Sequence, residues 1–132
     1  MRRVLVGLLP LVLAACAGGG PGSPAPAPAA EDALVVALDR GDGTEPERYT
    51  LSCADPAVGD LPDPAAACAT LRGLTDPFAP PSGDVACTEI YGGPQTAQVT
   101  GRWAGADVDL ALARTDGCQI AQWDRLGVLL PD

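Results

Sequence analysis

The cysteines constrain this 132-residue chain more than any other feature. One of the five, Cys16, directly follows an N-terminal apolar run, and the other four lie downstream at Cys53, Cys68, Cys87 and Cys118. A chain of this length has room for one domain. It contains no histidine, which excludes a Ser-His-Asp triad and a His-ligated zinc site.

The first 15 residues have the pattern of a signal peptide. Arg2 and Arg3 precede a short apolar run over residues 4–13, which is shorter than the roughly 20 apolar residues of a membrane-spanning helix. The run ends in Leu13-Ala14-Ala15-Cys16 and so resembles the lipobox of bacterial lipoproteins, in which the cysteine is acylated and the chain is cut before it. We predict lipidation of Cys16. The alternative is an ordinary signal peptide followed by an unmodified cysteine.

The next segment has the composition of a tether. Residues 17–30 are only Ala, Gly, Pro and one Ser, which form no core and favour an extended chain. We predict a lipidated cysteine and tether over residues 16–31 and a domain over residues 32–132, exported and anchored to the cell membrane. Once residues 1–15 are removed, six Arg oppose 17 Asp and Glu, and a net charge of −11 disfavours binding to nucleic acid or anionic lipid.

The four downstream cysteines are predicted to form two disulfides. Export places them in an oxidising compartment, where thiolate metal sites compete with oxidation, and they form no CxxC motif. We therefore expect neither a metal nor another cofactor. Four cysteines allow three pairings, and their spacing does not choose among them. Each bridge would add roughly 3 kcal/mol to a small domain.

Hydrophobic patterning predicts an antiparallel α+β domain. Strands are expected over Ala33–Leu38, Glu47–Cys53, Gln95–Trp103, Asp107–Arg114 and Leu126–Leu130. A helix is expected over Asp63–Arg72, with Asp63 as N-cap and Pro64 in the first turn, and a short one over residues 115–121. Ala104-Gly105-Ala106 is a hairpin signal. Asp107 and Asp109 alternate along a strand, which favours a solvated face over an acid–base pair.

The segment from Cys87 to Pro94 is the best candidate for a functional loop. A cysteine fixes its start, and Gly92-Gly93 permit a sharp turn at its end. Thr88, Ile90 and Tyr91 favour extended backbone. We predict an extended loop held at its base by a disulfide, with Glu89 and Ile90 near the tip.

Several motifs together resemble the Streptomyces subtilisin inhibitor family. They are Leu51-Ser-Cys53, Pro62-Asp-Pro-Ala-Ala-Ala-Cys-Ala-Thr-Leu71, Cys87-Thr-Glu-Ile-Tyr91, Gly101-Arg-Trp-Ala-Gly105 and Cys118, in that order and spacing. The resemblance runs from about Ala33 to the C-terminus. It implies a five-stranded antiparallel sheet with two helices, and it pairs Cys53 with Cys68 and Cys87 with Cys118.

The resemblance also implies a function, which is inhibition of serine proteases by a reactive loop that mimics substrate. The chain would then not be an enzyme. The scissile bond would be Glu89–Ile90, and Cys87, Thr88 and Tyr91 would flank it and pair their backbone with the protease. The partner would be a subtilisin-like protease or, given Glu89, one that prefers Glu. The resemblance also implies a homodimer.

The loop departs from the family pattern at three places. Family members commonly carry Pro at the position of Thr88, a residue such as Met, Lys or Arg at that of Glu89, and Asp-Pro where this chain has Gly92-Gly93-Pro94. The first and last changes predict a less rigid loop. The charged side chain of Glu89 is predicted to fit poorly in the apolar specificity pocket of a subtilisin. The alternative function is a non-inhibitory binding or structural lipoprotein that retains the fold.

Overall fold

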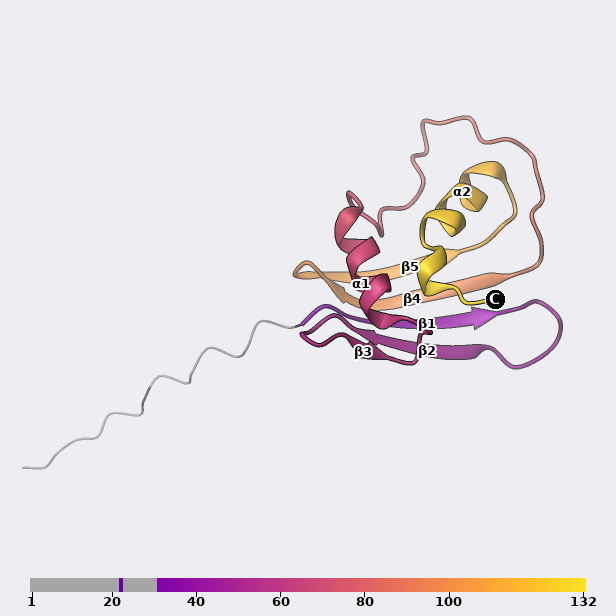
Figure 1. Cartoon of the computed structure of the whole chain (residues 1–132). Coiled ribbons are helices and arrows are strands. Elements are labelled where there is room, and N and C mark those ends of the chain that lie inside the picture. The colour runs from indigo at the N-terminus through magenta and orange to yellow at the C-terminus, as the bar shows by residue number, and fades with distance from the viewer. Residues whose placement is uncertain (1–21, 23–30) are drawn as a thin grey trace, which may run out of the picture.

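The computed structural model describes Gly22 and residues 31–132. The predicted signal peptide, Cys16 and all of residues 17–30 except Gly22 lie outside the described residues. The domain is a five-stranded antiparallel sheet in the order β3-β2-β1-β4-β5, with two helices over one face (Figure 1). The predicted α+β fold class is confirmed. Within the described part of the chain, no helix has the length and apolarity needed to cross a membrane.

The strands are β1 (Ala33–Asp39), β2 (Glu47–Ser52), β3 (Val58–Gly59), β4 (Thr96–Trp103) and β5 (Ala106–Leu112). The helices are α1 (Pro64–Gly73) and α2 (Gly117–Arg125), followed by a 3-10 turn, η1 (Gly127–Leu129).

The central strand β1 shows how the sequence produces the core. Leu34, Val36 and Leu38 alternate with half-exposed neighbours and are at most 2% exposed. Val36 lies opposite Val99 of β4 and Tyr49 of β2, so one face of the sheet gathers the apolar side chains. Complete burial of one such side chain contributes about 1.5–3 kcal/mol. The helices pack on this face.

The hairpin between β4 and β5 forms where the sequence predicts it. Ala104 and Gly105 both have positive φ, 48° and 79°, as a two-residue turn of the I′ type requires. Trp103, directly before the turn, is only 8% exposed and packs in the core.

Helix α1 begins as its sequence indicates. The Asp63 carboxylate accepts a hydrogen bond of 2.9 Å from the Ala66 amide, and Pro64 occupies the first helical position. The buried face carries Ala67, Cys68 and Leu71. Cys68 is bonded to Cys53, just after β2, which ties the helix to the sheet.

The predicted strand over Leu126–Leu130 is wrong. These residues enclose η1, and Leu126, Leu129 and Leu130 are buried against the core. Leu126 and Leu129 lie three residues apart, so one 3-10 turn places both on the same side. The fifth strand is instead β3, whose two residues pair with Leu51 and Ser52. Two residues are too few to produce a recognisable hydrophobic pattern.

Candidate functional site

The long segment between α1 and β4 crosses the surface without helix or strand, and its last part forms an arch. Residues 81–91 are all exposed, and Ile90 and Tyr91 expose 59% and 66% of their surface. Residues 87–92 form the arch, here called the reactive loop after the role that the family resemblance implies for it. It lies at the end of the sheet where β5 ends and β4 begins (Figure 1).

The start of the reactive loop is fixed to the first turn of α2. Cys87 forms a disulfide with Cys118, which is the pairing that the family resemblance implies. Their Cα atoms are 5.2 Å apart. The Gly117 amide donates a 2.9 Å hydrogen bond to the Thr88 carbonyl. A Cβ atom at Gly117 would lie 2.0 Å from the Thr88 hydroxyl oxygen. Only glycine at position 117 therefore lets Thr88 approach α2 this closely.

The far side of the reactive loop is fixed as well. The Gly92 amide donates a 2.7 Å hydrogen bond to the Arg114 carbonyl, just beyond β5. A Cβ atom at Gly92 would lie 2.8 Å from Cδ1 of Ile120 on α2. Gly92 therefore allows the loop to pack closely on the helix. Gly92 thus has tertiary contacts with Arg114 and Ile120, which a prediction of loop flexibility from the glycine pair alone does not include.

Three exposed residues lie between these two attachments. Among the residues that the structure describes, Glu89, Ile90 and Tyr91 form no hydrogen bond with the rest of the chain. Their backbone groups are therefore free to pair with an incoming strand. The arrangement is a short peptide that is attached to the domain at both ends and exposed to solvent between them.

A family model described as subtilisin inhibitor-like matches residues 30–114. The chain belongs to the subtilisin inhibitor-like family. It is accordingly a protease inhibitor and not an enzyme, as the resemblance implies.

Several characterised proteins are similar to this subtilisin inhibitor-like chain. The subtilisin inhibitor of Streptomyces violaceus is 37% identical over 116 residues, which cover 81% of this chain and 79% of that protein. Subtilisin inhibitor-like protein 8 of Streptomyces virginiae is 34% identical over 100 residues, covering 70% and 89%. A crystal structure of Streptomyces caespitosus sermetstatin with Bacillus licheniformis subtilisin matches 76% of this chain and 97% of that one, at 25% identity and a TM-score of 0.49.

In this subtilisin inhibitor-like domain, the residues that support the loop are those that sequence reasoning missed. Gly117, Ile120 and the carbonyl of Arg114 hold it, and all three lie on or just before α2. Asp116 caps that helix by accepting a 2.9 Å hydrogen bond from the Gln119 amide. The run Asp116-Gly117-Cys118 is a visible N-cap signal beside a cysteine, and it could have pointed to this support.

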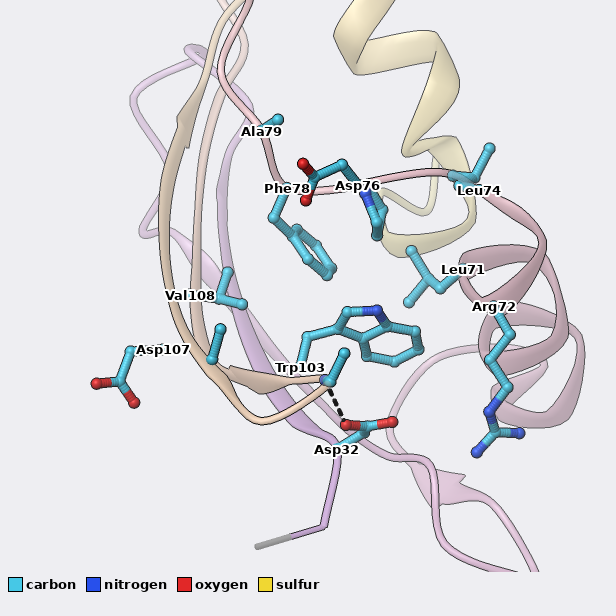
Figure 2. A pocket seen from close by; sticks show the side chains of 13 residues that line it. Asp32, Leu71, Arg72, Leu74, Asp76, Phe78, Ala79, Trp103, Asp107 and Val108 are labelled. Carbon is cyan, nitrogen blue, oxygen red and sulfur yellow. Dashed lines mark hydrogen bonds between the residues drawn. The ribbon is translucent and has the colours of Figure 1, made fainter.

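A hollow of the inhibitor domain lies at the opposite end of the sheet. It has a volume of about 630 Å³, and Trp103 and Phe78 are among the residues that line it (Figure 2). The two rings are arranged edge to face, with their centroids 5.9 Å apart. The Asp32 carboxylate is engaged by the Ala104 amide at 2.8 Å, and Asp107 points away from the rings. Trp103 is therefore a packing residue of the core.

The predicted solvated face of β5 is also present. Asp107 and Asp109 are exposed, and each is held by a neighbour on β4. Asp107 forms a 2.6 Å ion pair with Arg102, and Asp109 accepts a hydrogen bond from Gln98. Both carboxylates thus have structural partners on the sheet.

One cluster in the described chain has the residue types of a metal site. Potential ligand atoms of Cys87, Asp116 and Cys118 lie within 4.8 Å of one another. The two sulfurs form a disulfide and are not thiolates, so they are poor metal ligands. The cluster belongs to the support of the reactive loop.

Proposed function

We propose that this chain inhibits a serine protease by presenting the reactive loop as a substrate mimic, with Glu89–Ile90 as the scissile bond. The observation that carries the proposal is the double attachment of the loop around three exposed residues. Thr88 is held on one side of the bond and Gly92 on the other.

The physical basis of tight binding is preorganisation. Both ends of the loop are already ordered by hydrogen bonds and one disulfide, so little conformational entropy is lost on binding. The free backbone of Glu89, Ile90 and Tyr91 then pairs with the protease as an added strand.

The same attachments explain how a substrate mimic resists turnover. When the protease serine attacks the Glu89 carbonyl, the Ile90 amine is the leaving group. That amine stays near the acyl group because Gly92 remains bonded to Arg114, and the Cys87–Cys118 bridge holds the acyl side. Re-formation of the bond is intramolecular, with the large effective concentration of such reactions. Cleavage is therefore readily reversed.

Glu89 determines the class of protease. It is exposed, and among the described side chains no cation forms an ion pair with it. Transfer of an unpaired carboxylate to an apolar pocket costs several kcal/mol, whereas a cation in the pocket would offset this. The target is a serine protease that prefers Glu.

An inhibition panel tests the proposal with residues 16–132 carrying Cys16→Ser. We expect inhibition of a Glu-specific serine protease, and weak or no inhibition of subtilisin. Glu89→Met should transfer inhibition to subtilisin, and Glu89→Lys to trypsin. Asp84→Met is the matched control, because it removes the same charge from an exposed site outside the reactive loop.

If no protease of the panel is inhibited at micromolar concentration by the chain or by its Glu89 variants, the proposal fails. The fold would then serve a non-inhibitory binding role. A change in specificity with Asp84→Met would equally count against Glu89 as the specificity residue.

We also propose that the protein is exported and anchored through a lipid at Cys16, as the N-terminal sequence predicts. The orientation of the domain is consistent with this. Ala33 is the first residue of β1 and pairs with Arg102, beside the β4–β5 turn. The reactive loop is instead bonded to Arg114, beyond the other end of β5. A strand of this length spans roughly 20 Å, so Ala33, at the start of the described domain, and the reactive loop lie at opposite ends of the sheet. Cys16→Ser should move the protein from the membrane fraction to the soluble fraction.

A homodimer is the remaining part of the proposal. The helix-free face of the sheet carries Val35 and Ala37 at its centre, both half-buried. They form a small apolar centre on a face whose neighbouring positions, such as Thr50 and Thr100, are polar, so a second copy would meet a mixed surface. Sedimentation equilibrium of the Cys16→Ser chain tests for dimers directly.

A further inference from the structure

A second segment projects beside the reactive loop at the same end of the sheet. The connection between β1 and β2, residues 40–46, leaves the sheet where β4 begins and β5 ends. A Cβ atom at Gly41 would lie 2.6 Å from Cβ of Pro94, so this hairpin packs against the segment that follows the reactive loop. Figure 1 shows both segments at the right-hand end of the sheet.

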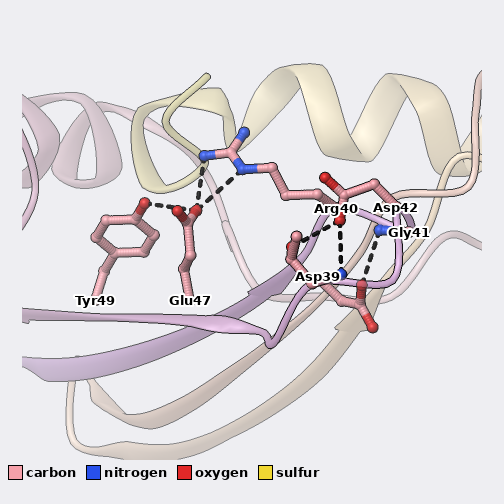
Figure 3. Close-up of polar contacts among 7 residues, drawn as sticks. Asp39, Arg40, Gly41, Asp42, Glu47 and Tyr49 are labelled. Carbon is pink, nitrogen blue, oxygen red and sulfur yellow. Dashed lines mark hydrogen bonds and ion pairs between the residues drawn. The ribbon is translucent and has the colours of Figure 1, made fainter.

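The hairpin is ordered by its own side chains. The Asp39 carboxylate accepts a 2.8 Å hydrogen bond from the Gly41 amide. Asp42 accepts from the Thr44 amide at 3.0 Å and from the Thr44 hydroxyl at 2.6 Å, and these bonds lower the pKa of Asp42. At the base, Arg40 pairs with Glu47 at 2.7 Å (Figure 3). An ordered hairpin, like an ordered loop, loses little entropy when it binds.

The surface between the hairpin and α2 is concave. A hollow of about 320 Å³ is lined by Pro46 of the hairpin, Thr96 of β4, Ala113 beyond β5 and Gln119 of α2. Gln119 is adjacent to Ile120, which supports the reactive loop. This end of the molecule thus presents two ordered projections with a hollow beside them.

The size of a stable interface requires more than the reactive loop. Protease–inhibitor complexes bury roughly 800 Å² per partner and use about 20–30 residues a side. The reactive loop supplies six residues, and a protease seated on Glu89–Ile90 must therefore contact neighbouring surface. The hairpin packs on Pro94, on the leaving side of the bond, and residues 41–45 are exposed.

We propose that residues 41–45 form a second contact surface for the protease, on the leaving side of the scissile bond, and that they meet a basic patch there. This inference rests on the proposed function. Glu45 is exposed and makes no ion pair with another described residue, while the nearby Arg40 is occupied by Glu47. Residues 31–132 carry six Arg against 17 Asp and Glu, so the domain as a whole also favours a basic partner.

Association kinetics with a Glu-specific serine protease test the inference, using residues 16–132 with Cys16→Ser. Glu45→Arg reverses a charge on the hairpin, and Glu31→Arg makes the same change at the opposite end of the sheet. At low salt we expect Glu45→Arg to slow association about tenfold and Glu31→Arg less than about twofold. The difference should shrink at about 0.5 M salt, because screening shortens the reach of the charges.

Hydrogen exchange gives a readout independent of charge. The amides of Gly43 and Thr44 should exchange more slowly in the complex than in the free inhibitor. Equal slowing of association by the two reversals, or unchanged exchange at both amides, overturns the inference while leaving the proposed function intact. Absence of any inhibition overturns both.

Discussion

Gly117 is the residue on which the position of the reactive loop depends most directly. We predict that Gly117→Ala weakens protease inhibition by about 10–100-fold, because overpacking of about 1–3 kcal/mol would displace Thr88. The new Cβ atom would lie 2.0 Å from the Thr88 hydroxyl oxygen. Stability should change less than inhibition, since Thr88 is exposed and its displacement disturbs no part of the core. Inhibition constants and urea unfolding measure the two effects separately.

A second substitution checks the physical cause. Thr88→Ala removes the hydroxyl and leaves Cβ of residue 88 at 3.3 Å from the new atom, a tight contact that a shift of a few tenths of an ångström in the exposed loop relieves. The double variant Thr88→Ala/Gly117→Ala should therefore regain most of the lost inhibition relative to Thr88→Ala alone. Failure to recover would mean that the close contact is not what positions the loop.

Glu47 connects the hairpin to the sheet electrostatically. Its carboxylate accepts hydrogen bonds from the Tyr49 hydroxyl at 2.9 Å and from Arg40 (Figure 3). These bonds lower the pKa of Glu47 below 4.5 and raise the pKa of Tyr49 above 10.0, since the ionised Glu and the protonated Tyr are favoured together. The contribution of Glu47 to stability is thus present above the unfolded pKa and lost as the pH falls through the folded pKa.

We predict a pH-dependent effect of Glu47→Gln. The free energy of unfolding should be lower than that of the unchanged chain between pH 6 and 8, and the difference should disappear as the pH falls below about 4.5. Urea unfolding at a series of pH values measures this. Glu45→Gln, at an exposed carboxylate of the same hairpin without an ion pair, should show no such dependence. A difference that persists at low pH would exclude the proposed linkage.

At the scale of elements, the two disulfides have different consequences. They close 15 and 31 residues of sequence, and a doubling of loop length changes the closure entropy by only about 0.6 kcal/mol. Their surroundings differ more. Cys53 and Cys68 are 6% and 1% exposed between sheet and helix, whereas Cys87 is exposed at the start of the reactive loop.

We predict that the two bridges can be separated by experiment. Cys53→Ala/Cys68→Ala should lower the free energy of unfolding by about 2–5 kcal/mol and leave inhibition in the folded fraction. Cys87→Ala/Cys118→Ala should turn the inhibitor into a substrate, because the acyl side of the cleaved bond is no longer held. Denaturant unfolding and the rate of cleavage at Glu89–Ile90 distinguish them. Rapid cleavage of both variants would contradict the assignment.

At the scale of the whole molecule, Asp32 closes the end of the sheet away from the reactive loop. Its carboxylate accepts from the Ala104 amide at 2.8 Å, and its carbonyl accepts from the Cys53 amide at 2.8 Å. We predict that a chain starting at Glu31 folds alone and unfolds like residues 16–132. A chain starting at Ala33 should have a free energy of unfolding lower by about 1–3 kcal/mol, because it lacks two hydrogen bonds of about 0.5–1.5 kcal/mol each. Urea midpoints compare them, and equal midpoints would show that Asp32 contributes little.

The sequence by itself determined the local elements and the family. Alternation along Ala33–Leu38, the Asp63-Pro64 helix start and the Ala104-Gly105 turn act through neighbouring residues, so their patterns are visible in the chain. The motif resemblance supplied the disulfide pairing and the location of the exposed loop. Leu126–Leu130 shows the limit of patterning, because a short apolar run is compatible with either a strand or a 3-10 turn.

Only the tertiary structure decided how the loop is held and what lies beside it. Gly92 against Ile120, Thr88 against Gly117 and Gly41 against Pro94 are contacts between segments distant in sequence. They depend on the packing of α2 on the sheet and on the relative positions of strand ends. Local propensity assigns flexibility to a glycine pair, whereas close packing fixes Gly92 in place, and no pattern of neighbouring residues encodes that difference.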